Sequence, residues 1–453
     1  MVVRFPLKSL ALIVSASVWL TACGDAEDTP PKPEVSQVET TEAAVTEQAS
    51  SQTSEAQVDR KAVVVNYADI AHATYQDALQ TAQQLDKAVD ELLDNPTEET
   101  LAQARQAWLQ ARVPYQQSEV FRFGNPVVDE WEGQLNAWPL DEGLIDYVAS
   151  DGYEHEMGNE GAGANIIASQ QINVGGTTQD VSKLTPALLA DLNEIGGSEA
   201  NVATGYHAIE FLLWGQDRNG FAPGAGERPA TDYATGEACT NGNCDRRGQY
   251  LNAATDLLIQ DLQWMVQQWA PGEDGNYRAE LVALQPEEAY QRMLFGMGSL
   301  SLGELAGERM KVALEANSYE DEHDCFSDNT HNSHFYNGKG IQNVYLGRYE
   351  RVGGPVVEGP SLSDLIAATD PQLDKKLRSD LEQSMQALGE MKQTAEAGLP
   401  VRFDMMIAPD NEQGHKLINA AINALVEQTG TIEQAASKVD VKSLEPDDAG
   451  HAF

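Results

Sequence analysis

A histidine and a glutamate stand three residues apart in the apolar segment Gly205–Gly215. Residues three apart share one face of a helix, so His207 and Glu210 are expected to lie side by side. An imidazole and a carboxylate among Phe, Leu and Trp cost free energy unless they are paired or coordinate something. The spacing therefore allows two interpretations, metal ligation by both side chains or a structural His–Glu hydrogen bond.

Ionisable residues crowd the segment 320–334, which contains three of the chain's eight histidines. Imidazole and carboxylate groups together suit zinc or iron. The spacing matches no standard zinc motif, and a solvated polar loop is the alternative interpretation. We expect four side chains of this segment, those of His323, Asp328, His331 and His334, to line a binding cleft.

Further charged residues are expected to face the same cleft. Glu304 and Glu308 are four apart and share a helix face, next to Arg309. A solvated helical face is the simpler explanation for this pair. Arg122, in the phrase Phe-Arg-Phe-Gly, could face the cleft as well. Because the His–Glu pair and the histidine-rich loop each lack partners within their own segments, we predict that they meet at a junction between two halves of the chain.

The elements that must position these residues are helices, because apolar residues recur with helical spacing nearly everywhere and strand-like alternation is scarce. A glycine- and proline-rich stretch, 215–248, separates two halves that look faintly alike. The sequence predicts an all-α fold of two related helical-bundle domains, 59–235 and 236–453, with long irregular loops and a cleft between them. Apolar stripes mark helices at 78–92, 101–111, 251–269, 286–316, 373–391 and 417–425; Asn95-Pro96 should end the first, and Pro114 should bend or end the second.

The N-terminus has the pattern of an exported, lipid-anchored protein. Two basic residues precede an apolar run, 10–20, that is too short to span a membrane and right for a signal peptide. The residues Leu20–Cys23 that follow resemble the lipobox of bacterial lipoproteins. Residues 1–23 are therefore expected to be a signal peptide and Cys23 the lipidated first residue of the mature chain. An ordinary signal peptide that is cleaved elsewhere is the alternative.

Composition limits the environment and the partners of the folded part. Residues 24–58 contain no aromatic residue and predict a disordered acidic linker that tethers the body to the lipid. By resemblance to lipoproteins, Gly24 favours the outer membrane, so we expect a cell-envelope protein that faces the periplasm. The formal net charge of −42 argues against nucleic acid as a partner, because a duplex would be repelled.

Cysteine use agrees with an exported protein. Cys239 and Cys244 flank Thr-Asn-Gly-Asn, in which Asn-Gly is a strong turn signal. In an oxidising compartment these two cysteines are expected to form a disulfide. Cys325 is then left over, either buried and inert or available as a ligand.

Several of these motifs together resemble the imelysin-like family. The segment Gly205–Gly215 looks like its Gly-x-His-x-x-Glu motif, and the loop His323–His331 looks like that of its iron-regulated protein A branch; the phrases 121–124 and 137–141 agree. The resemblance covers about residue 65 to the C-terminus. It implies two related helical bundles, an envelope location and a cleft site that His207 and Glu210 line. Members of the family are classified as metallopeptidases and linked to iron uptake.

The leading functional hypothesis is an envelope-anchored binding protein for iron or an iron-bearing ligand, acting with envelope iron-uptake components. Its cofactor would be a divalent metal, iron or zinc. The alternative is a metallopeptidase with His207 and Glu210 as metal ligands. That reading needs a third ligand, an open coordination position and a base, none of which the motif itself supplies. A structural lipoprotein, in which the His–Glu pair only supports the fold, is the third possibility.

Overall fold

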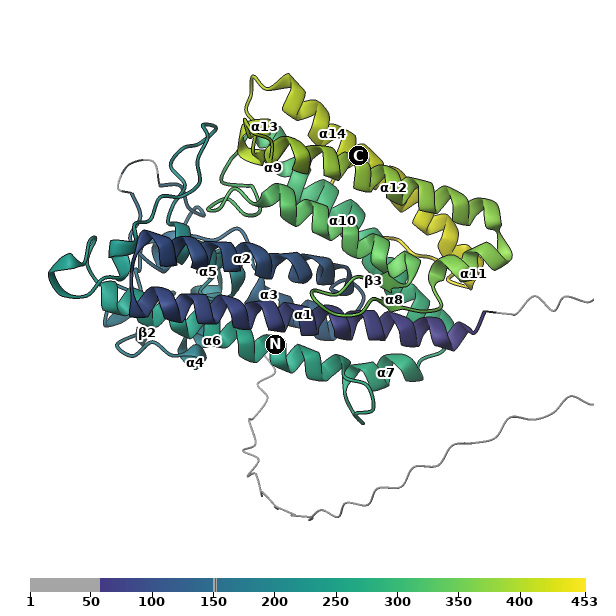
Figure 1. The fold of residues 1–453 in the computed structure, drawn as a ribbon, viewed down its shortest axis with the longest axis horizontal. Coiled ribbons are helices and arrows are strands. Elements are labelled where there is room, and N and C mark those ends of the chain that lie inside the picture. The colour runs from purple at the N-terminus through teal and green to yellow at the C-terminus, as the bar shows by residue number, and fades with distance from the viewer. Residues whose placement is uncertain (1–57, 150, 152) are drawn as a thin grey trace, which may run out of the picture. The chain divides into compact units, whose positions relative to one another are not determined.

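The computed structural model describes residues 58–149, 151 and 153–453. The predicted signal peptide, the lipobox with Cys23 and the linker up to residue 57 lie outside the described residues. The described residues from 58 onwards form one compact unit, and the predicted all-α fold is confirmed (Figure 1). Among the described residues, no helix is both long and apolar enough to cross a membrane.

The first set of helices packs around α1 (Arg60–Asp94). It lies against α2 (Glu98–Ser118) and α6 (Cys244–Trp269), which Figure 1 shows running alongside it. The short helix α5 (Gly205–Trp214), which carries the His–Glu pair, packs on α2 and α6. α3 (Pro126–Leu135) packs on α5 and α6. The pair is thereby held inside this bundle.

A second set of helices follows in the chain. α8 (Pro286–Ser299), η6 (Leu300–Lys311) and α9 (Val312–Ala316) form one unbroken helix whose middle part, η6, is a π-helix. The predicted helix over 286–316 is thus confirmed. α12 (Pro371–Ala395) and α14 (Glu412–Ala436) pack on each other, while α10 (Thr330–Leu346) contacts both α12 and α2. α10 therefore links the two sets.

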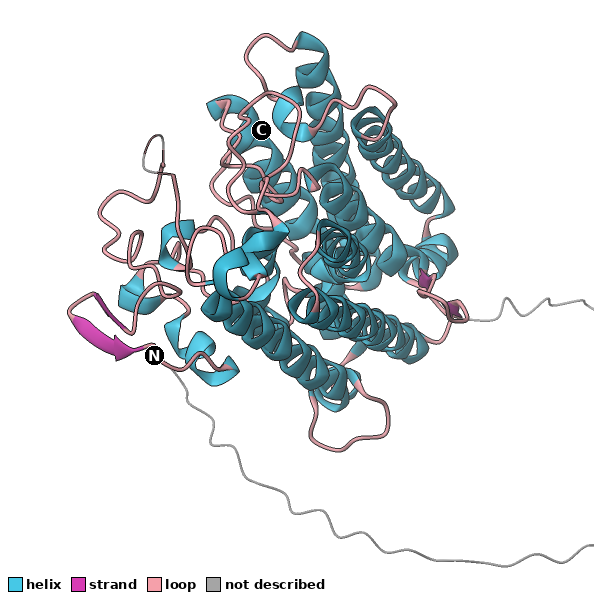
Figure 2. Cartoon of the chain, turned by 60° about the vertical axis from the view of Figure 1, so that its left-hand side comes forward, coloured by secondary structure: helices cyan, strands magenta, loops and turns pink. Residues whose placement is uncertain are grey.

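Shorter elements connect these helices. Figure 2 shows the small hairpin of β1 (Gln171–Val174) and β2 (Thr177–Asp180), which pair antiparallel with Gln171 opposite Asp180. A second antiparallel pair joins β3 (Arg348–Tyr349) to β4 (Val357–Glu358). The remaining helical segments are η1 (Glu119–Phe121), η2 (Glu142–Leu144), α4 (Pro186–Leu192), η3 (Ile195–Gly197), η4 (Ala230–Tyr233), η5 (Gly236–Ala238), α7 (Tyr277–Ala283), α11 (Leu362–Thr369), α13 (Phe403–Met406) and η7 (Ser437–Val439).

Local sequence explains where the helices begin and end. The Thr97 side chain caps α2 in a capping box with Thr100. α1 ends just before Asn95-Pro96, as predicted, but α2 continues past Pro114 to Ser118. Pro114 therefore does not end that helix. In η6 a Cβ on Gly303 would lie 2.7 Å from the Asp447 carbonyl oxygen, so only glycine lets the C-terminal segment pack so closely.

The apolar core does not divide at residue 235. Its larger part contains residues of α1, α2, α5 and α6 together with residues of α8 and α10, and a smaller part lies between η6, α12, α13 and α14. α6 follows the predicted boundary yet packs on α1. The division into domains 59–235 and 236–453 stays a prediction. Near that boundary Cys239 and Cys244 form a disulfide, and Cys325 is free.

Candidate functional site

His207 and Glu210 lie side by side in α5, where both are buried. The Nδ1 atom of His207 is 2.9 Å from Oε2 of Glu210. The other carboxylate oxygen of Glu210 accepts hydrogen bonds from the backbone N–H and the hydroxyl of Ser327, at 3.0 and 2.6 Å. Glu210 thus connects α5 to the histidine-rich loop, and both of its oxygens have partners.

The loop places His323 and Asp324 next to this pair. The rings of His207 and His323 are 4.8 Å apart, and Oδ1 of Asp324 is 4.0 Å from Nδ1 of His207. Arg112 of α2 donates a hydrogen bond to Oδ1 of Asp324 at 2.8 Å, and the same guanidinium nitrogen is 3.3 Å from Nε2 of His323. The loop therefore meets α5 and α2 at one buried point.

Three side chains at this point could hold a metal ion. His207, His323 and Asp324 each offer one ligand atom, and the three atoms lie within 4.8 Å of one another. Nε2 of His207 and Nδ1 of His323 are buried and have no hydrogen-bond partner in the part of the chain that the structure describes. Two histidines and one carboxylate form a donor set that suits iron and related transition metals. A nitrogen of Arg112 lies between two of these ligands, so a bound metal would compete with it.

Burial and the neighbouring charges set the protonation of the group. Burial lowers the pKa of His207 and of His323 well below the ordinary histidine range, and nearby arginines lower both further. Burial would raise the pKa of Asp324, but Arg112 outweighs it and holds that pKa below its usual value. Burial and the charge of Asp324 raise the pKa of Glu210 well above its usual value. Neutral imidazoles beside an ionised carboxylate are what metal coordination requires.

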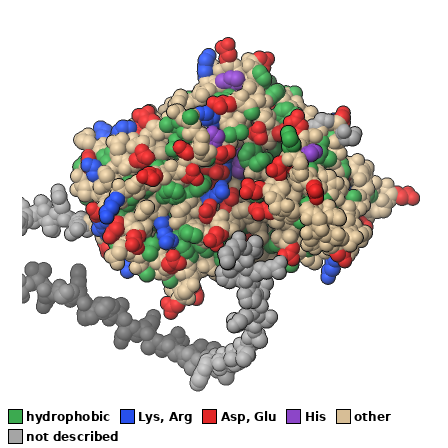
Figure 3. All heavy atoms as spheres, turned by 180° about the vertical axis from the view of Figure 1, so that it is seen from behind, with side chains coloured by type: hydrophobic (Ala, Val, Ile, Leu, Met, Phe, Trp, Pro, Cys, Tyr) green, Lys and Arg blue, Asp and Glu red, His purple; other side chains and the backbone are tan. Residues whose placement is uncertain are grey.

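A large acidic cleft opens beside the site. Its volume is about 780 Å³, and His323 lines it, whereas His207 and Glu210 do not. Figure 3 shows acidic side chains spread over one face of the molecule, with histidines among them. Negative walls raise the local concentration of cations. The acidic lining residues are Asp129, Glu132, Asp141, Glu142, Glu154, Glu156, Glu194, Glu199, Glu304, Glu308, Glu320 and Asp321.

The imelysin (peptidase M75) family model matches residues 71–432. The chain belongs to the imelysin family. It is 25% identical over 326 residues to iron-regulated protein A of Synechococcus elongatus, covering 70% of this chain and 72% of that protein. The predicted resemblance to the family is confirmed.

Two solved structures resemble this chain. One was described as an iron-regulated protein A precursor from Parabacteroides distasonis; it has a TM-score of 0.60 at 19% identity and covers 85% of this chain and 97% of that one. The other is an imelysin-like protein from Psychrobacter arcticum, with a TM-score of 0.53 at 13% identity, covering 83% of this chain and 95% of that one. At these identities both likenesses show the fold.

Besides His323, four predicted site residues line the acidic cleft, namely Arg122, Glu304, Glu308 and Arg309. Nη1 of Arg122 is 3.5 Å from Glu304, and Arg309 donates to the same Glu304 oxygen at 2.8 Å. Glu304 and Arg309 are five apart, a spacing that suits the π-helical winding of η6. Glu308 lines the same cleft, where its Oε1 lies 3.0 Å from Nε2 of His451. These charged groups thus neutralise one another at the cleft wall.

The other three predicted residues do not line the cleft. His331 is buried, with Nε2 3.1 Å from Arg402. His334 is buried against the ring of Phe403 at 5.0 Å, and neither of its ring nitrogens has a hydrogen-bond partner. Burial lowers the pKa of both histidines to about 3, which keeps them neutral. Asp328 adopts a left-handed backbone and is buried away from the cleft.

The sequence reasoning missed Arg112 and did not select Asp324. Arg112 stands four residues after Trp108 on the apolar stripe of α2, a position where an arginine predicts a buried ion pair. Its guanidinium lies 5.2 Å from the ring of Tyr206. Asp324 differs from the other acids of its loop in having three hydrogen-bonded partner side chains, namely Arg112, Asn329 and Ser333. That difference is not visible in the sequence.

A separate group of buried carboxyls lies behind the loop. Both oxygens of Glu322 and both of Asp404 are buried and have no hydrogen-bond partner among the described residues, and the same holds for Oδ1 of Asp328. Burial, together with the charges of nearby acids, raises the pKa of Asp328 and of Asp404 to about 7. Burial and the neighbouring Asp404 raise the pKa of Glu322 well above its usual value. These acids therefore favour the protonated form.

Proposed function

We propose that this imelysin-family chain is an envelope-anchored binding protein that takes up iron, or a ligand that carries iron, at His207, His323 and Asp324. The observation that carries the proposal is the meeting of these three ligand atoms within 4.8 Å at a buried point. The name of the Synechococcus elongatus relative, iron-regulated protein A, supports iron as the metal. Zinc suits the same donor set and is the metal to compare.

Each residue of the site has a separate task in this proposal. The two imidazoles and the Asp324 carboxylate would hold the metal. Glu210 would release its proton when the metal binds and act through His207, because a carboxylate on the second ring nitrogen fixes the tautomer and the orientation of a ligating histidine. Arg112 keeps Asp324 ionised and gives way when a metal binds. The acidic cleft would attract the cation.

The metallopeptidase alternative requires a different arrangement. Glu210 would have to ligate the metal together with His207, although both of its oxygens have hydrogen-bond partners. A third ligand and a water activated by a base would also be needed. Incubation of the metal-loaded chain with a casein substrate tests this directly. Cleavage that is lost in Glu210→Gln would favour the alternative over simple binding.

Metal titration of the full chain tests the binding proposal. After treatment with a chelator, calorimetry with Fe²⁺ under anaerobic conditions, and with Zn²⁺, should show one bound ion per chain. His323→Ala should weaken binding at least about 100-fold, because a ligand is lost. His415→Ala is the matched control. Nε2 of His415 lies 2.9 Å from the backbone carbonyl oxygen of Ala408, and both residues are far from the site in the sequence. Equal binding by wild type and His323→Ala would contradict the proposal.

Glu210→Gln should weaken metal binding by about 10–100-fold while leaving the helical content unchanged. The glutamine keeps the shape of the side chain, but its amide can donate a hydrogen to Nδ1 of His207 and so favour the tautomer that carries hydrogen on Nε2. A ring nitrogen that carries hydrogen cannot bind a metal. The metal affinities of Glu210→Gln and His323→Ala are measured side by side. If Glu210→Gln loses as much affinity as His323→Ala, Glu210 is itself a metal ligand.

The proposal also includes a membrane anchor. The lipid on Cys23 would hold the protein at the outer membrane, with the folded body facing the periplasm. Cys23→Ser should leave an unprocessed precursor or release the protein in soluble form, because the acylated residue is lost. Fractionation and mass spectrometry of the N-terminus measure this outcome. A mature chain that starts elsewhere and carries no lipid would contradict it.

A further inference from the structure

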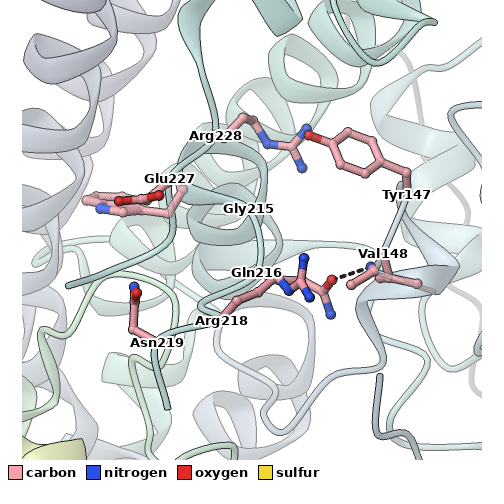
Figure 4. A pocket seen from close by; sticks show the side chains of 10 residues that line it. Tyr147, Val148, Gly215, Gln216, Arg218, Asn219, Glu227 and Arg228 are labelled. Carbon is pink, nitrogen blue, oxygen red and sulfur yellow. Dashed lines mark hydrogen bonds between the residues drawn. The ribbon is translucent and has the colours of Figure 1, made fainter. Parts of the chain in front are cut away.

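A second, smaller cavity lies at the C-terminal end of α5, and it shares no residue with the acidic cleft. Its volume is about 240 Å³. Figure 4 shows Arg228 on one side of this space, Arg218 and Gln216 on the opposite side, and Tyr147 with Val148 between them. The cavity is therefore bordered by two arginines that come from the same loop.

Arg228 is a buried arginine in which three of the five N–H donors have no hydrogen-bond partner among the described residues. Its Nη1 donates to Asp146 at 2.8 Å and to Asp232 at 3.2 Å. The guanidinium lies between two aromatic rings, 5.0 Å from the ring of Tyr147 and 5.3 Å from that of Phe211. The unpartnered donors are on its buried Nε and Nη2 atoms, as far as the described part of the chain shows. The aromatic rings and the two aspartates hold the group in a fixed orientation.

An unpaired N–H of a buried, charged group costs free energy, so a partner for this edge is expected. The Nε–H and Nη–H groups of a guanidinium point in parallel and match the two oxygens of a carboxylate or a phosphate. Gly215 borders this edge: a Cβ at that position would lie 3.7 Å from Nε of Arg228. We propose that this cavity binds a small anion that bears a carboxylate or phosphate group.

The surroundings of Arg228 limit which anion fits. Arg247 also donates to Asp146, at 2.6 Å, so that carboxylate is shared by two arginines. Among the described residues, Arg218 has Asp151 as its ion-pair partner, at 3.3 Å, and both side chains are mostly exposed, so Arg218 is free to turn to a ligand. Glu227 also lines the cavity, so an anion has to lie away from that carboxylate, in the space between the two arginines. A volume below the usual range of about 300–1,000 Å³ for ligand pockets favours a small anion over a nucleotide.

Calorimetric titration of the chelator-treated full chain with inorganic phosphate, and separately with succinate, tests the proposal at constant chloride. One of the two should bind saturably at one site. Val148→Phe, which fills the cavity without changing charge, should abolish binding, and Arg218→Ala should weaken it about 3–10-fold. Arg348→Ala, which removes an arginine that is paired only with exposed acids, is the matched control and should bind like wild type.

Arg228→Lys keeps the charge but loses the paired N–H edge, and it should bind at least about 10-fold more weakly if circular dichroism shows it folded. His323→Ala should bind the anion like wild type, which separates this site from the metal proposal. The proposal is overturned if neither anion binds saturably, or if Val148→Phe and Arg218→Ala both bind like wild type.

Discussion

Replacing Arg112 with methionine is expected to lower the free energy of unfolding by about 3–5 kcal/mol. Arg112 and Asp324 are both fully buried, and their charged atoms are 2.8 Å apart. Methionine fills a similar volume but leaves the Asp324 carboxylate buried without its counter-charge. The loss of one partner of a buried pair is far more costly than the loss of both, because an isolated charge stays in an apolar environment.

Denaturant unfolding of four chains measures this effect: wild type, Arg112→Met, Asp324→Asn and the double variant. The double variant should be more stable than Arg112→Met alone, and the cycle then gives the coupling energy of the pair. Arg60→Met is the control, because its partner Asp440 is largely exposed and such a pair contributes about 1 kcal/mol or less. A similar loss in both methionine variants would contradict the role given to Arg112.

The same variant connects stability to the metal site. Because the Arg112 guanidinium lies between Asp324 and His323, its removal leaves those ligands free for a cation. Zn²⁺ or Fe²⁺ that binds the folded chain stabilises it by RT ln(1 + [L]/Kd), about 2.7 kcal/mol at 100 times Kd. Metal should therefore raise the stability of Arg112→Met more than that of wild type. An equal gain in both would show that the metal and the arginine do not compete.

The sequence predicted the fold class and most long helices because their apolar stripes and terminal signals are local. Asn95-Pro96 ends α1 as predicted, and Pro286 begins the helix that continues to Ala316. Pro114 does not end its helix, which continues to Ser118 in a packed bundle where tertiary contacts override the local preference, and a bend at Pro114 stays a prediction. The packing of α6 on α1 likewise depends on contacts that no local pattern contains.

The candidate site was predictable in its first half and less so in its second. His207 and Glu210 could be paired from their spacing alone, since three residues along a helix place them together. For the loop, composition identified a chemically rich segment but not which of its side chains meet α5. His323 reaches the site, whereas His331 and His334 begin α10 and are buried elsewhere. That choice depends on how the chain turns between residues 316 and 330.

Asp404→Asn is expected to make the protein more stable at pH 8, by at most about 4 kcal/mol, since a shift of one pKa unit corresponds to 1.36 kcal/mol. In the folded chain burial raises the pKa of Asp404 from 3.8 to about 7. The folded state therefore keeps this proton while the unfolded chain has already lost it. The stability of wild type should fall as the pH rises from about 4 to about 7 and should change little from this group above that range.

Asparagine resembles the protonated form of the carboxyl, so the advantage of Asp404→Asn should be small near pH 4 and should grow until about pH 7. Denaturant unfolding at pH 4.5, 6 and 8 in the presence of a chelator measures this trend, with the exposed Asp410→Asn as the control. The charge of Asp404 raises the pKa of Glu322 and of Asp328, so the three carboxyls are coupled. The double variant Asp404→Asn/Glu322→Gln should therefore change the free energy of unfolding by less than the sum of the two single effects. If Asp404→Asn is no more stable than wild type at pH 8, the prediction is wrong. These carboxyls would then ionise in the folded protein without loss of stability, because a bound cation or a hydrogen-bond donor compensates their charge.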